Sequence, residues 1–457
     1  MTFKKLALGC SIAAALATVS NIAAAAAGYS LIEQSGSGMG NAFAGGAASA
    51  EDASTIYYNP AGMSRLKGKQ VAVALHAILP SAKFSPGATA AGASLQPVGN
   101  NGGDPGDWGY VPNGYFSMEI DPAMQFGVGV NVPFGLQTNY DPAWIGRFQA
   151  IQSKIQTINL NPSISYQVND TMSLGMGLSY QRIDGKLTSA VNWAAAAFTA
   201  AGGGAGGLAA ANALNAAGQN EGVTNITGND AAWGYNFGAL FNVTPQTRIG
   251  VSYRSSIKHN LSGSVNFTNR PTAAVIGGLL AAGLATAVPD GAVTLAVTLP
   301  DTFSTSVFHS LSDKWDVMAD ATWTGWSVFK QLKIDRTSGA NLITVQENWH
   351  DTWRVGVGAN HHYNGQWTTR MGLAYDQTPV PDASRTARIP DQDRIWLSFG
   401  GQYKPGKDSA IDVAYTHLFI QNASIADNQA AIGRGNLTGT YSSIATNILS
   451  VQYTYGF

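Results

Sequence analysis

A strict alternation of apolar and polar side chains marks the stretch Leu449-Ser450-Val451-Gln452-Tyr453-Thr454-Tyr455-Gly456-Phe457. Successive side chains of a β-strand point to opposite faces, so the alternation predicts a strand with one apolar and one polar face. A half-buried strand of a soluble protein alternates in the same way. A strand that finishes on an aromatic residue suits an outer-membrane β-barrel, in which every strand has to be paired.

The same alternation recurs along the chain, and its repetition is the strongest fold signal. It is found at residues 172–180, 233–243, 248–253, 353–358, 371–375 and 411–415, where the second face carries mostly small or polar residues. Segments of about ten residues with one apolar face are the signature of a transmembrane β-barrel, although each segment alone is a weak signal.

The connections between these segments alternate between short and long. Tight turns are expected at 169–170, 244–246, 312–313, 364–365 and 405–407, and long loops at 184–232, 268–301, 377–392 and 421–445. Tryptophans fall near segment ends, as in the aromatic girdles of barrels, although a soluble sandwich core also uses them. We predict an all-β fold, a transmembrane antiparallel β-barrel with short periplasmic turns and long external loops.

Two long loops contain apolar stretches without charge, at 194–217 and 271–289. The second is long enough to raise the question of a transmembrane helix, but the prolines at its ends and its internal glycines argue against one. We predict loop helices with apolar faces, where an apolar ligand first lands, or flexible loops with no binding role.

The N-terminus has the layout of a secretory signal peptide. Lys4 and Lys5 precede an apolar run and the small residues Ala24-Ala25-Ala26, which predicts residues 1–26 as a signal peptide cleaved after Ala26. Cys10, the one cysteine of the chain, falls within it, so the mature chain has no thiol chemistry. The signal peptide holds two of the 26 basic residues and no acidic residue, so the mature chain has a net charge of 24 − 27 = −3. This charge does not indicate a basic surface for nucleic acid.

Two separated blocks carry a resemblance to a known family. The first holds Gly28-Tyr29-Ser30-Leu31-Ile32-Glu33-Gln34, Gly38-Met39-Gly40-Asn41 and Asn59-Pro60-Ala61-Gly62; the second holds Trp326-Ser327, Gln331-Leu332-Lys333, Thr337-Ser338-Gly339, Pro379-Val380-Pro381-Asp382 and Ile389-Pro390-Asp391-Gln392-Asp393-Arg394. Together they resemble the FadL-type long-chain fatty-acid transporters of the Gram-negative outer membrane. The resemblance implies a monomer with a barrel of about 14 strands, residues 69–457, and an N-terminal hatch in its lumen, residues 27–68.

The resemblance also implies a passive route for fatty acids: capture at the external loops, a lumen pocket, hatch movement and lateral exit through the wall. A candidate for the lateral opening is Pro133-Phe134-Gly135, where a strand-like run meets a residue without an N–H and one without a side chain. The alternative is an ordinary strand end before a loop.

A carboxylate head group needs a cation, and the planar fork of Arg binds a carboxylate at two points. We expect Arg182 to follow the alternation of 172–180 onto the inward face and to act, by resemblance, as a pocket arginine. Lys333 resembles the second pocket cation of the family. Arg394, beside Asp391 and Asp393, completes a lumen charge network or forms a structural ion pair.

Hatch residues are assigned gating roles by resemblance alone. Tyr29 stands where the family has a Phe that reaches toward the pocket. Asn59-Pro60-Ala61 would fix the hatch bend, since Asn caps a turn and Pro removes a donor. The implied partners are hydrophobic small molecules, outer-membrane lipid and lipopolysaccharide, and the outer-membrane assembly machinery at Phe457.

Rival functions find less support. The seven His show no zinc-type spacing beyond the pair His361-His362, and no nucleophile elbow or phosphate loop is present. No enzyme activity, metal or cofactor is therefore expected; a barrel lipase would need a Ser–His pair at the wall, and a general porin an open lumen. The main alternative is an uptake channel for monoaromatic hydrocarbons or other small hydrophobic compounds.

Overall fold

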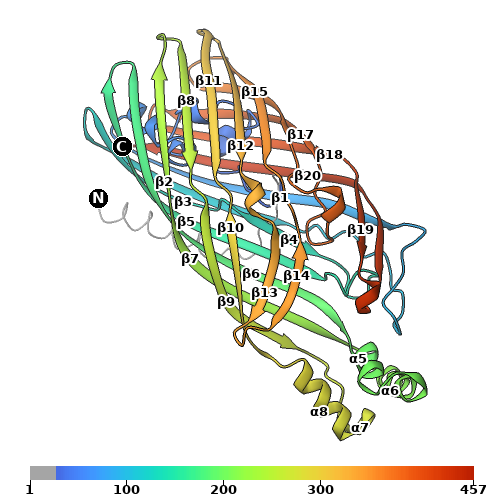
Figure 1. Cartoon of the computed structure of the whole chain (residues 1–457). Helices are drawn as coiled ribbons and strands as arrows, with labels where there is room; N and C mark the ends of the chain where they lie inside the picture. The colour runs from blue at the N-terminus through green and yellow to red at the C-terminus, as the bar shows by residue number, and fades with distance from the viewer. Residues whose placement is uncertain (1–26) are drawn as a thin grey trace.

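The computed structural model describes residues 27–457, so the predicted signal peptide lies outside the described residues. Strands form one antiparallel sheet of 20 segments. The sheet closes on itself because β1 (Lys69–Pro86) pairs with both β2 (Gly109–Asp121) and β20 (Asn436–Gly456). Closure joins the first and last strands, as a lipid environment requires of a sheet that spans it. Figure 1 shows the resulting tilted barrel.

Within residues 27–457, fourteen strands form the barrel wall. Eight are single segments: β1, β2, β5 (Gln152–Asn169), β6 (Met172–Asn192), β7 (Glu221–Asn242), β16 (Trp367–Asp376), β17 (Arg394–Gly406) and β20. Six are interrupted once: β3/β4 (Met124–Asn131, Gly135–Asn139), β8/β9 (Thr247–Arg254, Ile257–Phe267), β10/β11 (Gly291–Leu299, Thr302–Ser312), β12/β13 (Trp315–Thr324, Gln331–Arg336), β14/β15 (Asn341–Gln346, Thr352–His362) and β18/β19 (Ser409–Ile420, Ala423–Asn428). Counting each interrupted pair once gives 20 − 6 = 14 strands.

Burial follows the predicted alternation and confirms the barrel. In the final strand Leu449, Val451 and Tyr453 are exposed, whereas Ser450 and Gln452 are buried. The exposed apolar side chains of neighbouring strands make a continuous outer surface, and such a surface is stable only against lipid. A search for helices long and apolar enough to cross a membrane found none among the described residues.

The strands extend further than the predicted loop boundaries. Within the predicted loop 184–232, β6 continues to Asn192 and β7 already begins at Glu221. The outward residues in these extensions are polar, so a prediction based on alternating apolar residues misses them. Their backbone pairing is unaffected. The remaining loops hold α5 (Trp193–Ala200), α6 (Gly204–Ala216), α7 (Ala273–Ile276) and α8 (Gly278–Ala287), so the apolar stretches are loop helices. Short 3-10 turns are η2 (Trp326–Val328), η3 (Asp382–Ser384) and η4 (Ala430–Ile432).

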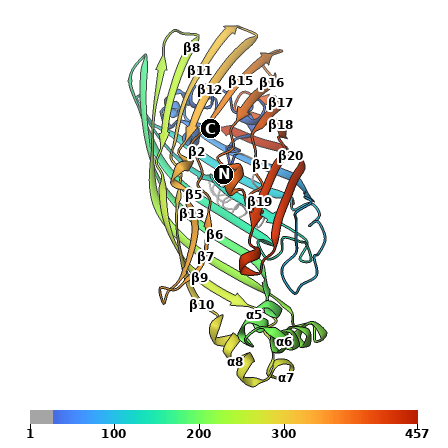
Figure 2. The ribbon, with the colours of Figure 1, turned by 45° about the vertical axis from the view of Figure 1, so that its right-hand side comes forward.

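The residues ahead of β1, here called the hatch segment, fold into α2 (Gly36–Met39), α3 (Gly46–Ser49), α4 (Thr55–Tyr58) and η1 (Pro60–Arg65). They lie inside the barrel, toward the end opposite α5–α8 (Figures 1 and 2). Inward glycines of the wall allow this close packing. A Cβ at Gly372 would stand 2.0 Å from the carbonyl carbon of Asn41, and one at Gly250 would stand 1.9 Å from the Ala47 oxygen.

Candidate functional site

The barrel wall is incompletely hydrogen-bonded where the third strand breaks. β3 pairs with β2 as far as Gly114↔Val130, and after the break β4 pairs with β5. Among the described residues no strand pairing joins β4 to β2. Pro112 on β2 and Pro133 at the break flank this gap, and neither has an N–H to donate across it.

The hatch segment covers the break from the inside. Ser30 forms an antiparallel bridge with Phe134. Beside it, the Leu31 N–H donates to the Pro133 carbonyl over 2.8 Å, and the Gly135 N–H donates to the Tyr29 carbonyl over 2.9 Å. Residues 29–31 therefore act as a short extra strand on the kink Pro133-Phe134-Gly135, which the sequence singled out as an interruption.

Tyr29 is enclosed by aromatic rings. Its ring centroid lies 4.8 Å from Trp326, 5.5 Å from Trp349, 5.9 Å from Phe329 and 6.0 Å from Phe134. The side chain is 1% exposed, and its hydroxyl has no hydrogen-bond partner within residues 27–457. Burial, with a smaller contribution from the Glu347 carboxylate, raises the pKa of Tyr29 well above its usual value. The hydroxyl is therefore neutral and unsatisfied.

An apolar cavity of about 660 Å³ begins at Tyr29. Strands β5, β6, β7, β9, β10 and β13 provide its walls, through Ile155, Ile183, Leu187, Ile226, Leu261, Val293, Leu295, Val297, Leu299, Leu332 and Ile334, with Phe329 beside the tyrosine. Lys154 and Lys186 border it with their backbone, because they stand directly opposite each other on the same face of the β5–β6 ladder as the exposed Arg182. The side chains that point into the cavity are thus uncharged.

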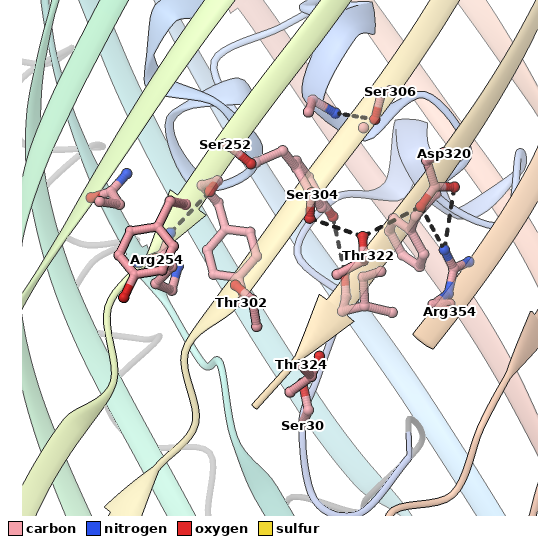
Figure 3. A pocket seen from close by; sticks show the side chains of 18 of the residues that line it. Ser30, Ser252, Arg254, Thr302, Ser304, Ser306, Asp320, Thr322, Thr324 and Arg354 are labelled. Carbon is pink, nitrogen blue, oxygen red and sulfur yellow. Dashed lines mark hydrogen bonds and ion pairs between the residues drawn. The ribbon is translucent and has the colours of Figure 1, made fainter. Parts of the chain in front are cut away.

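A second cavity, of about 910 Å³, lies on the other side of the aromatic cluster and has a mixed lining, about half polar and half apolar (Figure 3). Figure 3 shows hydroxyls of Ser252, Ser304 and Thr322 facing it, together with the ion pair between Arg354 and Asp320, whose charged groups are 3.3 Å apart. Ser30 lines this second cavity while its neighbour Tyr29 lines the apolar one. Residues 29–30 therefore stand at the boundary between the two spaces.

Asn59-Pro60-Ala61 joins the hatch segment to the wall. The Asn59 amide donates to the carbonyls of Ala47, at 2.7 Å, and Ala239, at 3.0 Å, while its oxygen accepts the Ala61 N–H at 3.0 Å. Gly175 and Gly238 are register partners on β6 and β7. A Cβ at Gly238 would stand 1.9 Å from Asn59 Oδ1, and one at Gly175 would stand 2.3 Å from the Ala61 nitrogen.

The predicted pocket cations lie elsewhere. Arg182 is on the outer face of β6, with its side chain 53% exposed and 2.8 Å from Asp184, so the expected inward orientation is wrong. Its position has the same parity as the outward Leu178 and Tyr180, so the alternation itself places it outside. Lys333 also faces outward, 48% exposed and 3.1 Å from Asp335, because its neighbours Leu332 and Ile334 line the cavity.

Arg394 is buried in the lumen and bonded to Asp391. The other oxygen of Asp391 accepts the Gly28 N–H at 2.8 Å. Arg394 thus stabilises the carboxylate that holds the start of the hatch segment, a structural ion pair of the kind that the sequence left open.

Four further wall arginines were missed by the sequence reasoning. Arg248 donates to the Ala48 carbonyl, Arg254 to the Tyr57 carbonyl and Arg354 to the Ala42 carbonyl, while Arg370 pairs with Glu51 over 2.8 Å. All lie on inward positions of β8, β15 and β16 and bind the hatch segment. The alternation of each strand could have predicted that these arginines point inward. It could not have predicted their partners in the hatch segment, which lie about 200 to 320 residues away in the sequence.

Comparison with known proteins agrees with this architecture. The family model described as outer membrane protein transport protein (OMPP1/FadL/TodX) matches residues 16–457. The long-chain fatty acid transport protein of Escherichia coli K12 is 30% identical over 440 residues, covering 93% of this chain and 95% of that protein.

Solved structures show the same barrel. A FadL homologue of Pseudomonas aeruginosa has a TM-score of 0.82 and 28% identity, covering 94% of this chain and all (100%) of that chain. The Ralstonia pickettii toluene transporter TbuX, with a TM-score of 0.62, 21% identity and coverage of 92% and 98%, shares the fold. This chain belongs to the FadL family of outer-membrane transport proteins.

Proposed function

We propose that the protein carries long-chain fatty acids passively across the outer membrane, through the apolar cavity and out sideways between β2 and β4. Relatives in its family are named for the transport of long-chain fatty acids, and uptake of hydrophobic compounds is common to the fatty-acid and toluene transporters that it resembles. The observation that carries the proposal is an apolar cavity that reaches Tyr29, the residue whose carbonyl binds Gly135 at an unpaired place in the wall.

The contrast between the two cavities favours a lateral exit. An acyl chain loses about 0.8 kcal/mol for each methylene that moves from an apolar to a hydrated environment, so ten methylenes cost about 8 kcal/mol. Movement onward into the second cavity, whose lining includes hydroxyls and the Arg354–Asp320 ion pair, carries part of that cost. Movement through the gap beside Phe134 leads instead into the apolar interior of the membrane, so no energy source other than a gradient is required.

Tyr29 contacts both the apolar cavity, where a ligand would lie, and the kink Pro133-Phe134-Gly135, where it would leave. Its ring borders the apolar cavity, while its carbonyl and the neighbouring Leu31 N–H hold the kink. A ligand that displaces the ring from its aromatic cluster therefore also withdraws the strand that covers Pro133-Phe134-Gly135. Asn59-Pro60-Ala61, fixed on the glycines of β6 and β7, serves as the anchor about which the segment moves.

The head-group site remains a prediction. Arg182 and Lys333 lie on the outer surface near the long-loop end, so we assign them a contact with the acid during capture rather than inside the cavity. The uncharged lining of the cavity specifically favours the second candidate function, uptake of monoaromatic hydrocarbons or other neutral compounds. We also infer a monomer, since the barrel closes on its own strands, and recognition of the exposed Phe457 by the assembly machinery.

Uptake of labelled oleate and labelled toluene by cells that lack their own transporter tests the proposal. Gly185→Phe fills the cavity, because a Cβ there meets no heavy atom closer than 3.6 Å. Gly401→Phe is the matched control on the outer face of β17, where the nearest atom is 3.8 Å away.

We expect oleate uptake with the wild type and the control and its loss with Gly185→Phe. Toluene uptake without oleate uptake would assign the hydrocarbon function instead. Equal oleate uptake by all three proteins would exclude the cavity from the route.

A further inference from the structure

Two adjacent rows of hydroxyl groups cross the inner wall where it lines the second cavity. Each row joins neighbours in the strand register: Ser252, Ser304 and Thr322 in one, and Thr302, Thr324 and Thr352 in the other. All of them line the cavity. A hydroxyl donates one hydrogen bond as well as accepting bonds, so the two rows, here called the hydroxyl array, offer a set of donors to an anionic group.

Arg254 lies at one end of the hydroxyl array, opposite Thr302 in the register of β8 and β11 (Figure 3). One terminal nitrogen of its guanidinium donates to Ser179 Oγ over 3.2 Å, and the other donates to the Tyr57 carbonyl over 2.9 Å. The remaining N–H groups have no acceptor within residues 27–457. Both partners are neutral, and no ion pair of the described chain includes Arg254.

The carboxylates of the second cavity gather at its other end. Arg354 pairs there with Asp320 over 3.3 Å, and Asp376, its register partner on β16, accepts the Ala27 N–H over 3.3 Å. The strand that carries Arg354 is separated from β8 by β11 and β12, which places it about 14 Å away along the sheet. Arg254 is therefore a cation without a nearby counter-charge, beside a set of hydrogen-bond donors. A bound anion would supply the missing charge.

The hydroxyl array is next to the apolar cavity. Leu299 lines the apolar cavity, and Thr302, a short step further along the chain, lines the second one. This step is about 10 Å for an extended chain. Tyr29 and Ser30 mark the same boundary on the side of the hatch segment. A long acyl chain with its head group at Arg254 would pass Tyr29 and reach the apolar cavity, so one amphipathic molecule can occupy both spaces.

We propose that Arg254, with the hydroxyls of Thr302 and Ser252, binds the carboxylate head group of a long-chain fatty acid whose chain lies in the apolar cavity. The inference rests on the proposed function and adds a head-group site inside the barrel, where neither Arg182 nor Lys333 points. A planar guanidinium binds a carboxylate through two parallel hydrogen bonds. The site favours an ionised acid over a neutral compound of the same length, because only the acid supplies the counter-charge.

The test compares oleate with oleyl alcohol, which has the same chain and no charge. Affinities of the full mature chain in detergent micelles are measured with labelled ligands. The readout is the ratio of the two affinities, because the partition of each ligand into micelles is the same for every variant. Arg254→Gln removes the cation, and Arg254→Lys retains it. Thr302→Val removes one neighbouring hydroxyl and keeps the shape of the side chain.

Arg254→Gln also removes the contact with the Tyr57 carbonyl, so it needs a control for docking of the hatch segment. Arg248→Gln is that control. Arg248 is on the same strand and donates to the Ala48 carbonyl over 3.1 Å, but it is not among the described residues that line the second cavity. Loss of a hatch contact alone changes the affinities for both ligands together and leaves their ratio unchanged.

We expect the ratio of oleate to oleyl alcohol affinity to fall about 10- to 100-fold in Arg254→Gln, the value of a hydrogen bond between charged groups. Thr302→Val lowers the ratio about 3-fold, Arg254→Lys lowers it less than Arg254→Gln does, and Arg248→Gln leaves it at the wild-type value. An unchanged ratio in Arg254→Gln, or an equal fall in Arg248→Gln, would overturn the head-group site and leave the proposed function intact. Failure of the wild type to bind oleate would contradict the proposed function itself.

Discussion

Tyr29→Phe, which removes one oxygen, is predicted to hold residues 29–31 more firmly on the kink Pro133-Phe134-Gly135, the contact that we call the gate. The Tyr29 hydroxyl is buried without a hydrogen-bond partner in the described part of the chain. An unsatisfied buried polar group costs about 1–3 kcal/mol. Tyr29→Phe keeps the ring and its contacts with the aromatic cluster, so docking of residues 29–31 gains about 1–2 kcal/mol, and the open population falls about 5- to 30-fold.

The assay is the labelling rate of a single cysteine at Ser30 with a membrane-impermeant thiol reagent. Ser30→Cys is nearly isosteric, and Ser30 bridges Phe134 in the closed arrangement. Labelling then reports how often the segment leaves the kink. Tyr29→Ala is the opposite perturbation: truncation of a buried aromatic residue costs about 3–5 kcal/mol, so labelling accelerates more than 100-fold.

Tyr453→Phe, on the exposed outer face of β20, is the control and leaves the rate unchanged. The reasoning is refuted by Tyr29→Phe labelling as fast as the wild type or faster, since the hydroxyl would then contribute nothing to opening.

Three further predictions concern the docking of the hatch segment. Gly238→Ala places a methyl group against the Asn59 side chain and lowers stability by about 1–3 kcal/mol, measured as a lower urea midpoint in micelles. Burial raises the pKa of Glu33 from 4.5 to about 8, so the folded state binds its proton more tightly than the unfolded state. Stability therefore falls as pH rises from about 4.5 to 8, and Glu33→Gln flattens the pH profile of the melting temperature. Arg354→Gln breaks the buried pair with Asp320 at a cost of about 3–5 kcal/mol, seen as faster proteolysis of the hatch segment.

The wall was predictable from sequence because lipid and lumen impose a period of two on every strand. Leu449, Val451 and Tyr453 face outward as the alternation requires. The same rule also orients Arg182, and the prediction that the alternation carries it inward was wrong because its parity matches the outward Leu178 and Tyr180. The strand ends of β6 and β7 were missed because outward residues become polar where the strands leave the lipid.

The gate was only partly predictable. Pro133 signalled a break in its own strand, since proline lacks the N–H that a ladder needs. Pro112, which lies across the gap on the unbroken strand β2, and the covering strand at Tyr29 are distant from Pro133 in the sequence, and local pattern carries no information about such pairings. The wall arginines that bind hatch carbonyls were missed for the same reason.

A reversible lock between the hatch segment and the kink tests the central claim most directly. Ser30 and Phe134 are directly opposed in an antiparallel bridge, the arrangement that brings two Cβ atoms within reach of a disulfide. In Ser30→Cys/Phe134→Cys, oxidation is predicted to abolish uptake of labelled oleate and toluene and reduction to restore it, with each single variant insensitive to redox conditions. Undiminished uptake by the fully oxidised double variant would contradict release of the kink by the hatch segment.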